Sequence, residues 1–133
     1  MPSPKLQVAV LGAGNWAEHV HIPGWKRDPR VEVVVLADVV RDRAEEIGRQ
    51  FSIPEVTTDW QAAVSRPDVD VVTPSQTHFE LAMAALESGK HVLCEKPVAY
   101  DYRETRRASE RRKGLKTKLG FTFRYSPGVQ YVR

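Results

Sequence analysis

Residues 6–17 read LQVAVLGAGNWA, an apolar run that ends in two glycines separated by one residue. A second apolar run, VEVVVLA, spans residues 31–37 and is followed directly by Asp38, 21 residues past Ala17. A strand, a glycine turn, a helix and an acid in this order and at this spacing are typical of a βαβ unit that binds a dinucleotide.

Each residue of the glycine turn has a physical task in such a unit. Gly12 lets the chain turn sharply off the first strand, and Gly14 has no Cβ, so the backbone can approach a pyrophosphate. Ala17 is small enough for the helix to pack close to the sheet. A helix that begins near Asn15 and Trp16 points unpaired N–H groups at the phosphates. We therefore predict that Gly12, Gly14, Asn15 and Trp16 bind the cofactor.

The acid after the second strand bears on which dinucleotide is bound. Asp38 can accept both hydroxyl hydrogens of an adenosine ribose and should repel a 2′-phosphate, which favours NAD. Arg41 lies three residues further on and could pair with that phosphate in NADP. The sequence thus favours NAD and leaves NADP open, with both Asp38 and Arg41 as candidate cofactor-binding residues.

Length and composition limit the class of protein. A chain of 133 residues with 41% hydrophobic and 28% charged residues is typical of one globular core. Neither a secretory signal nor a run long enough to span a membrane is recognisable, so no membrane partner is expected. Cys94 is the only cysteine, which excludes an internal disulfide and favours the cytoplasm. We interpret it as a buried strand-end residue, with a reactive thiol as the alternative.

Nucleic-acid binding and metal binding are two further functions that the residue pattern bears on. Residues 101–118 hold eight basic residues against three acids. No pattern of a nucleic-acid fold accompanies them, so a solvated helix face is the interpretation and no nucleic-acid partner is predicted. His19 and His21 are two residues apart and would point to different sides of a helix, so no metal site is predicted.

Apolar β-branched runs alternate with helical stretches along the chain, which predicts an α/β fold with a doubly wound parallel sheet. About six strands are predicted, and right-handed crossovers between them favour the order 3-2-1-4-5-6. Pro23 should kink or stop the first helix. The predicted strands cover residues 6–11, 31–37, 55–57, 68–73, 90–94 and 117–123. The predicted helices cover residues 15–27, 41–51, 59–65, 76–88 and 101–113.

A second motif is more specific than the glycine turn. Residues 73–78 read TPSQTH, and residues 84–97 read AALESGKHVLCEKP. Together with the glycine turn, these stretches resemble the N-terminal Rossmann domain of the glucose-fructose oxidoreductase, inositol dehydrogenase and rhizopine-catabolism (Gfo/Idh/MocA) family. The resemblance runs from Val8 to Tyr131.

The resemblance implies roles for the Glu-Lys-Pro stretch. Lys96 would be the catalytic residue, assisting proton transfer while hydride moves to or from nicotinamide C4, and it would also contact the nicotinamide ribose. Glu95 would orient that lysine or the ribose, and Pro97 would shape the turn. All three are predicted to lie at the cofactor.

It also implies roles for the residues after the fourth strand. Thr73 and Pro74 would line the cofactor cleft with backbone and hydroxyl contacts, and His78 would either contact the cofactor or cap and pack its helix. Residues 68–74, DVDVVTP, are two or three residues shorter than the family pattern leads us to expect. That difference leaves the seating of the nicotinamide open.

The end of the chain departs further from the family. Residues 120–127, GFTFRYSP, resemble the segment that leads into the C-terminal α/β domain, and the sequence ends at Arg133. We therefore expect a dinucleotide-binding domain over residues 1–123 and the start of a linker over residues 124–133, with the C-terminal domain absent. That domain would supply most of the substrate pocket and the surface for a homo-oligomer.

These observations lead to one main hypothesis for function. It is a cytoplasmic NAD(P)-dependent oxidoreductase acting, in full length, on a hydroxyl of a sugar, inositol or related polyol, and this chain alone would be inactive. The alternatives are a non-catalytic dinucleotide-binding module and a split subunit completed by another chain.

Overall fold

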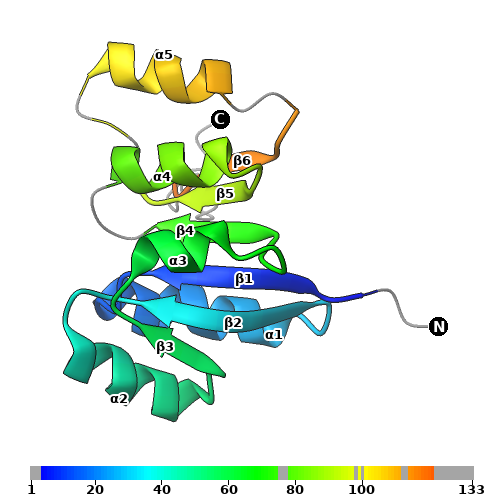
Figure 1. Ribbon diagram of the computed structural model, residues 1–133, viewed down its shortest axis with the longest axis vertical. Helices are drawn as coiled ribbons and strands as arrows, with labels where there is room; N and C mark the ends of the chain where they lie inside the picture. The colour runs from blue at the N-terminus through cyan, green and yellow to red at the C-terminus, as the bar shows by residue number, and fades with distance from the viewer. Residues whose placement is uncertain (1–3, 75–77, 98, 100, 112–113, 122–133) are drawn as a thin grey trace, which may run out of the picture.

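A six-stranded parallel sheet forms the centre of the molecule (Figure 1). The computed structural model describes residues 4–74, 78–97, 99, 101–111 and 114–121. The strands in chain order are β1 (Leu6–Leu11), β2 (Val31–Ala37), β3 (Glu55–Thr57), β4 (Val71–Pro74), β5 (His91–Cys94) and β6 (Thr117–Leu119). They are ordered β3-β2-β1-β4-β5-β6, which confirms the predicted topology.

Helices cover both faces of this sheet. They are the π-helical turn η1 (Ala17–His21), α1 (Ile22–Arg27), α2 (Arg41–Phe51), α3 (Trp60–Ser65), α4 (His78–Glu87) and α5 (Tyr102–Arg111). Successive residues of β1 divide between two cores: Val8 and Val10 pack on the side of α1 and α2, and Ala9 and Leu11 on the side of α3 and α4. Burial on both faces explains why the inner strands are continuous apolar runs. None of the described helices is long and apolar enough to cross a membrane.

The first helix differs from its prediction near Pro23. It starts at Asn15 and contains η1, in which the Ile22 N–H donates to the carbonyl of Ala17, five residues earlier. Pro23 lies in the first turn of α1, and the helix continues past it to Arg27, so the predicted stop at Pro23 is wrong. The described irregularity is the π turn, which ends two residues before the proline, and the alternative of a kink at Pro23 stays a prediction.

Several predicted boundaries also move. The strand predicted over 68–73 begins at Val71, although Asp70 already donates its N–H to Gln7 (2.9 Å) and accepts that of His91 (2.9 Å). The strand predicted over 117–123 ends at Leu119. Helix α3 starts after Asp59, whose carboxylate caps it by accepting the Ala62 N–H. The predictions for residues 76–77, 112–113 and 122–133 lie outside the described residues.

Helix α4 ends at Glu87, one residue before its predicted end. Gly89 has φ +73°, a conformation that favours glycine, and its N–H donates to Leu86 while the Lys90 N–H donates to Ala85. This pair of bonds is the Schellman motif that closes a helix. The apolar side chains of α4 are buried except for Phe79 and Ala84, which are half-buried.

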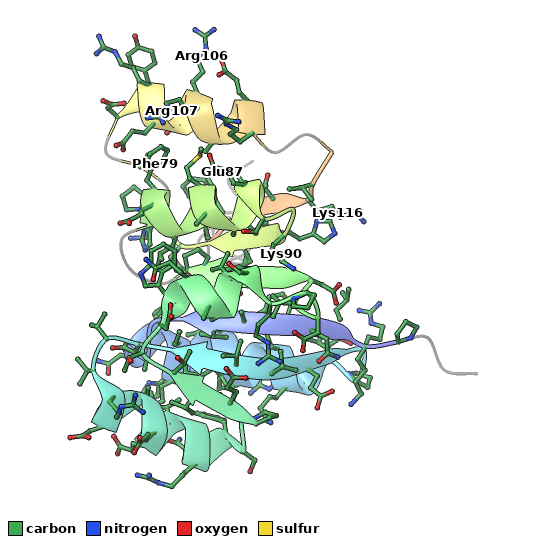
Figure 2. All side chains as sticks on the ribbon, in the orientation of Figure 1. Phe79, Glu87, Lys90, Arg106, Arg107 and Lys116 are labelled. Atoms are coloured by element: carbon green, nitrogen blue, oxygen red, sulfur yellow. The ribbon has the colours of Figure 1, made fainter. Side chains whose placement is uncertain are left out.

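Helix α5 packs mainly on α4, and it carries the basic residues singled out in the sequence. Figure 2 shows Arg107 reaching toward Phe79, with its guanidinium 5.6 Å from the ring centre. Arg106 pairs with Glu110 at 2.8 Å on the outer side of the helix. The described arginines of α5 thus lie on a solvated helix face, as interpreted, whereas Lys116 and Lys118 lie at β6.

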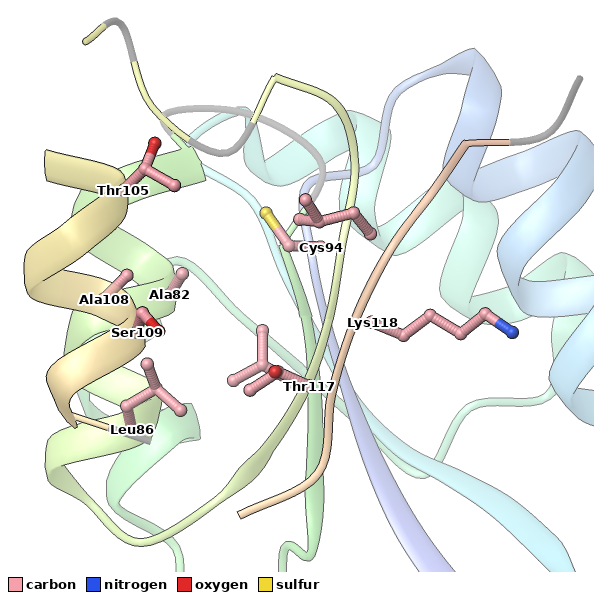
Figure 3. A pocket seen from close by; sticks show the side chains of 10 residues that line it. Ala82, Leu86, Cys94, Thr105, Ala108, Ser109, Thr117 and Lys118 are labelled. Carbon is pink, nitrogen blue, oxygen red and sulfur yellow. The ribbon is translucent and has the colours of Figure 1, made fainter. Parts of the chain in front are cut away.

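A cavity of about 280 Å³ lies between the α4–α5 pair and strands β5 and β6. Figure 3 shows Thr117 and Ala108 beside this cavity and Lys118 extending away from it. None of the residues predicted to bind cofactor lines it. The cavity results from α5 resting on α4 with only Ala108 buried among its described residues.

Candidate functional site

The glycine turn lies at the carboxyl edge of the sheet, beyond β1. Gly12 has φ +103°, and its N–H donates to the carbonyl of Ala37 at the end of β2 (2.7 Å). The carbonyl of Gly14 accepts the N–H of Glu18 (3.1 Å), so the helix begins here with its free N–H groups at this edge. A helix N-terminus of this kind attracts the phosphates of a nucleotide.

Asp38 holds the glycine turn in place. One carboxylate oxygen accepts the N–H of Ala13 (2.6 Å), and the other accepts the N–H of Val40 (2.7 Å). Each carboxylate oxygen has a second acceptor position, so the half-buried side chain can still receive ribose hydroxyls. The bond to Val40 follows a local pattern common for Asp, whereas nothing in the sequence indicates the bond to Ala13.

The arginines near this acid already have partners. Arg41 lies 3.5 Å from Glu45, one turn along α2. Arg43 hydrogen-bonds Glu46 (2.8 Å) and also Glu18 on the first helix, and these bonds raise the pKa of Arg43. Both arginines are therefore paired with glutamates and are not free to pair with a phosphate group near Asp38 without giving up these contacts.

Glu95 is the meeting point of the glycine-turn helix and the segment after β5. The Trp16 indole Nε1 donates to Oε1 of Glu95 (2.9 Å), and His21 Nε2 lies 3.0 Å from the same oxygen. The His21 contact is close but is not aligned as a hydrogen bond. Burial lowers the pKa of His21, and the Glu95 carboxylate opposes that shift. The sequence analysis considered His21 only as a metal ligand and did not predict its contact with Glu95, because no spacing pattern links residues so far apart in the chain.

Lys96 follows Glu95 and is exposed. Its peptide bond with Pro97 is cis, and His78 Nδ1 donates to the carbonyl of Pro97 at 2.5 Å. His78 thus ties the start of α4 to this segment, a role that neither of its predicted alternatives included. We call Glu95, Lys96 and Pro97 the lysine strap.

Thr73 and Pro74 lie at the end of β4, next to the strap, and their side chains are fully buried. The Thr73 hydroxyl accepts the indole N–H of Trp25 (3.2 Å), so it is engaged inside the fold. The Pro74 carbonyl accepts the N–H of Glu95 at 3.4 Å. Contact of Thr73 and Pro74 with a cofactor remains a prediction. Because both side chains are buried, such a contact would be made by their backbone atoms more readily than by their side chains.

The remaining polar residues near the strap take no part in a reactive cluster. Burial raises the pKa of the Cys94 thiol to about 12, with a smaller contribution from the negative charge of Glu95. Cys94 is therefore the buried strand-end residue of the first interpretation. His19 is exposed and His21 is buried, so they face different sides of the helix. Within the described ranges no three potential ligands gather around a metal position.

The arrangement can be compared with known proteins. Residues 6–123 match the Gfo/Idh/MocA family, an oxidoreductase family with an NAD-binding Rossmann fold. The chain belongs to the Gfo/Idh/MocA family. It is therefore an NAD(P)-binding Rossmann domain, and the resemblance inferred from the motifs is confirmed.

Three similar proteins show the range of this family. An inositol 2-dehydrogenase of Mycolicibacterium smegmatis is 39% identical over 92% of this chain and 37% of that protein. A 4-carboxy-2-hydroxymuconate-6-semialdehyde dehydrogenase of Sphingobium is 33% identical over 96% of this chain and 42% of its own length. The crystal structure of KijD10, a 3-ketoreductase of Actinomadura kijaniata in complex with TDP-benzene and NADP, has a TM-score of 0.86 at 31% identity and covers 96% of this chain and 42% of that one. The chain thus spans well under half the length of these Gfo/Idh/MocA proteins.

Proposed function

We propose that the chain binds NAD(H) across the carboxyl ends of β1, β2 and β4 and is the cofactor-binding half of a dehydrogenase. The substrate proposed is a hydroxyl of a sugar, inositol or related polyol, or the matching ketone. The observation that carries this proposal is the lysine strap, whose Glu95 is hydrogen-bonded to Trp16 on the glycine-turn helix. Through this bond Glu95 is fixed to the glycine-turn helix, and the exposed Lys96 is the next residue in the chain.

The residues present fit a dinucleotide. Gly12 has the backbone conformation of the tight turn, the helix N-terminus is directed to the same edge, and Asp38 keeps acceptor positions for a ribose. NAD is proposed over NADP because Asp38 carries a negative charge where a 2′-phosphate would lie. Arg41 and Arg43 are already engaged by acids, which supports the same choice.

The proposed chemistry assigns one task to each strap residue. When bound, the nicotinamide supplies a hydride acceptor or donor. In the direction of ketone reduction, the Lys96 ammonium would hydrogen-bond the carbonyl oxygen and donate a proton to it as that oxygen becomes a hydroxyl, and alcohol oxidation would return this proton to the amine. Glu95 and the carbonyl of Pro97 keep the backbone on both sides of this lysine in place through Trp16 and His78.

The test is a titration of the chain with NADH and with NADPH, followed by the fluorescence of the reduced nicotinamide. We expect saturable binding of both, with NADH bound more tightly. Binding of neither dinucleotide would refute the proposal. Lys96→Ala serves as a matched variant: it should weaken NADH binding only by the loss of the lysine's contact with the nicotinamide ribose, far less than a change in the glycine turn would, because Lys96 lies outside that turn.

A non-catalytic dinucleotide-binding module is the second candidate, because Lys96 is the one catalytic residue proposed among the described residues. Positioning of substrate against nicotinamide can be worth about 7–11 kcal/mol of the barrier, and one lysine supplies little of it. The 133 residues alone should therefore bind NADH with negligible turnover of inositols or hexoses. In a protein extended past Arg133, loss of turnover in Lys96→Ala with little change in NADH affinity would support the dehydrogenase, and absence of any turnover would favour the module.

A cytoplasmic location is part of the proposal, supported by the unpaired, buried Cys94.

A further inference from the structure

The Glu95 carboxylate receives two contacts from one helix, and both reach the same oxygen. Trp16 donates from the first turn, 79 residues away in sequence, and His21 Nε2 approaches to 3.0 Å from the π-helical turn. The side chain of His21 is 7% exposed and that of Glu95 is 12% exposed. Apart from this approach, His21 Nε2 has no hydrogen-bond partner among the described residues. A buried ring nitrogen is therefore directed at the residue that precedes Lys96 in the chain.

We propose that His21 is a positioning residue for Lys96 and acts through the Glu95 carboxylate. The proposal rests on the proposed function, since Lys96 is the group whose placement it explains. His21 sets which way the carboxylate of Glu95 points, and the carboxylate in turn sets the start of the strap.

The π-helical turn is what brings His21 to this place. In η1 the hydrogen bond from Ile22 to Ala17 spans five residues, so the helix takes up one more residue in this turn than an α-helix would. Ala17, His21 and Ile22 are consequently all buried, although His19 between them is exposed. π turns of this kind are found frequently at functional sites.

Backbone also packs closely on the Glu95 carboxylate. A Cβ atom added at Gly120 would lie 2.6 Å from Oε1 and 2.8 Å from Oε2 of Glu95. Because Trp16, His21 and the Gly120 backbone all lie against this carboxylate, the side chain has little freedom to turn. Beyond Lys96, the carbonyl of Pro97 is held by His78. The lysine therefore extends from a backbone that is fixed both before and after it.

The experiment observes Lys96 itself. Reductive methylation with ¹³C-formaldehyde gives each lysine a carbon signal and preserves its charge, and Lys96→Arg identifies the signal of Lys96 by its loss. We expect His21→Leu to move the Lys96 signal by more than its line width. His21→Gln should restore much of the original position, because its amide can donate to Glu95. His19→Leu, an exposed change on the same helix, should leave the signal in place.

Gly120→Ala displaces the same carboxylate by a second route, without altering His21. It should move the Lys96 signal as His21→Leu does, and it decides the question if circular dichroism shows that His21→Leu does not fold. An unmoved Lys96 signal in folded His21→Leu or in Gly120→Ala would overturn the proposal, since a purely structural histidine would affect stability and not this signal. NADH titration of the unchanged chain separates the two proposals, because failure to bind NADH would refute the function while the effect on Lys96 stands.

Discussion

Asp38 is predicted to have two separable tasks, and Asp38→Ser measures both. The aspartate accepts the N–H groups of Ala13 and Val40 at 2.6 and 2.7 Å. A serine hydroxyl can still reach the N–H two residues on, but it is too short for the glycine turn, so one bond to a charged acceptor is lost. Such a bond is worth about 1.5–3 kcal/mol. We expect the lower end for the free energy of unfolding, because water replaces part of the bond at this half-buried position.

The second effect of Asp38→Ser is on cofactor choice. Removing the negative charge should shift the preference toward NADPH by about 1–3 kcal/mol, or about 5- to 150-fold in the ratio of dissociation constants. Urea denaturation measures the first quantity and dinucleotide titration the second. Asp42→Ser, the same change at an exposed acid in the first turn of α2, is the control and should leave the ratio unchanged. An unchanged ratio in Asp38→Ser would show that Asp38 does not face the ribose, and unchanged stability would show that it does not hold the turn.

Three other perturbations have definite expected results. Gly14→Val should abolish NADH binding in titration while circular dichroism shows a folded protein, because the side chain occupies the space of the pyrophosphate. Burial lowers the pKa of His21 below its ordinary 6.5, so the unfolded state binds more protons and the free energy of unfolding should fall as the pH drops below about 6.5. Urea midpoints at about pH 5.5 and pH 7.5 measure this loss, which should shrink in His21→Gln. Gly89→Ala should cost about 1–2 kcal/mol of unfolding free energy, whereas Gly24→Ala, in α1 with open space around it, should add about 0.5–1 kcal/mol.

Local pattern was enough to predict most of the sheet. The strands over 6–11, 31–37 and 55–57 agree residue for residue, since apolar runs ended by turn residues have few other ways to bury themselves. The sixth strand was predicted too long because the chain turns after Leu119, where the Phe121 N–H donates to the carbonyl of Leu119 at 2.9 Å, and the apolar pattern carries no signal for this turn.

The sequence predicted the individual residues of the candidate site, but it did not predict the hydrogen bonds between them. Motifs identified Glu95 and Trp16 separately, but their hydrogen bond joins segments 79 residues apart and has no sequence signature. The π turn was missed for a related reason, because its widening is decided by what His21 and Ile22 pack against and not by helix propensity. Thr73 is predicted to line the cleft, yet its hydroxyl accepts the indole N–H of Trp25 in α1, the crossover helix between β1 and β2.

The attachment of α5 has a consequence for how the molecule opens. Its described residues bury a single alanine and rest over a cavity of about 280 Å³, so detaching this helix exposes little apolar surface. Segments with few buried contacts open locally at a free energy well below that of global unfolding. Amide hydrogens of α5 should therefore exchange with solvent deuterium through brief detachments of that helix, long before those of β1 and β2, and their exchange should be nearly insensitive to low concentrations of urea.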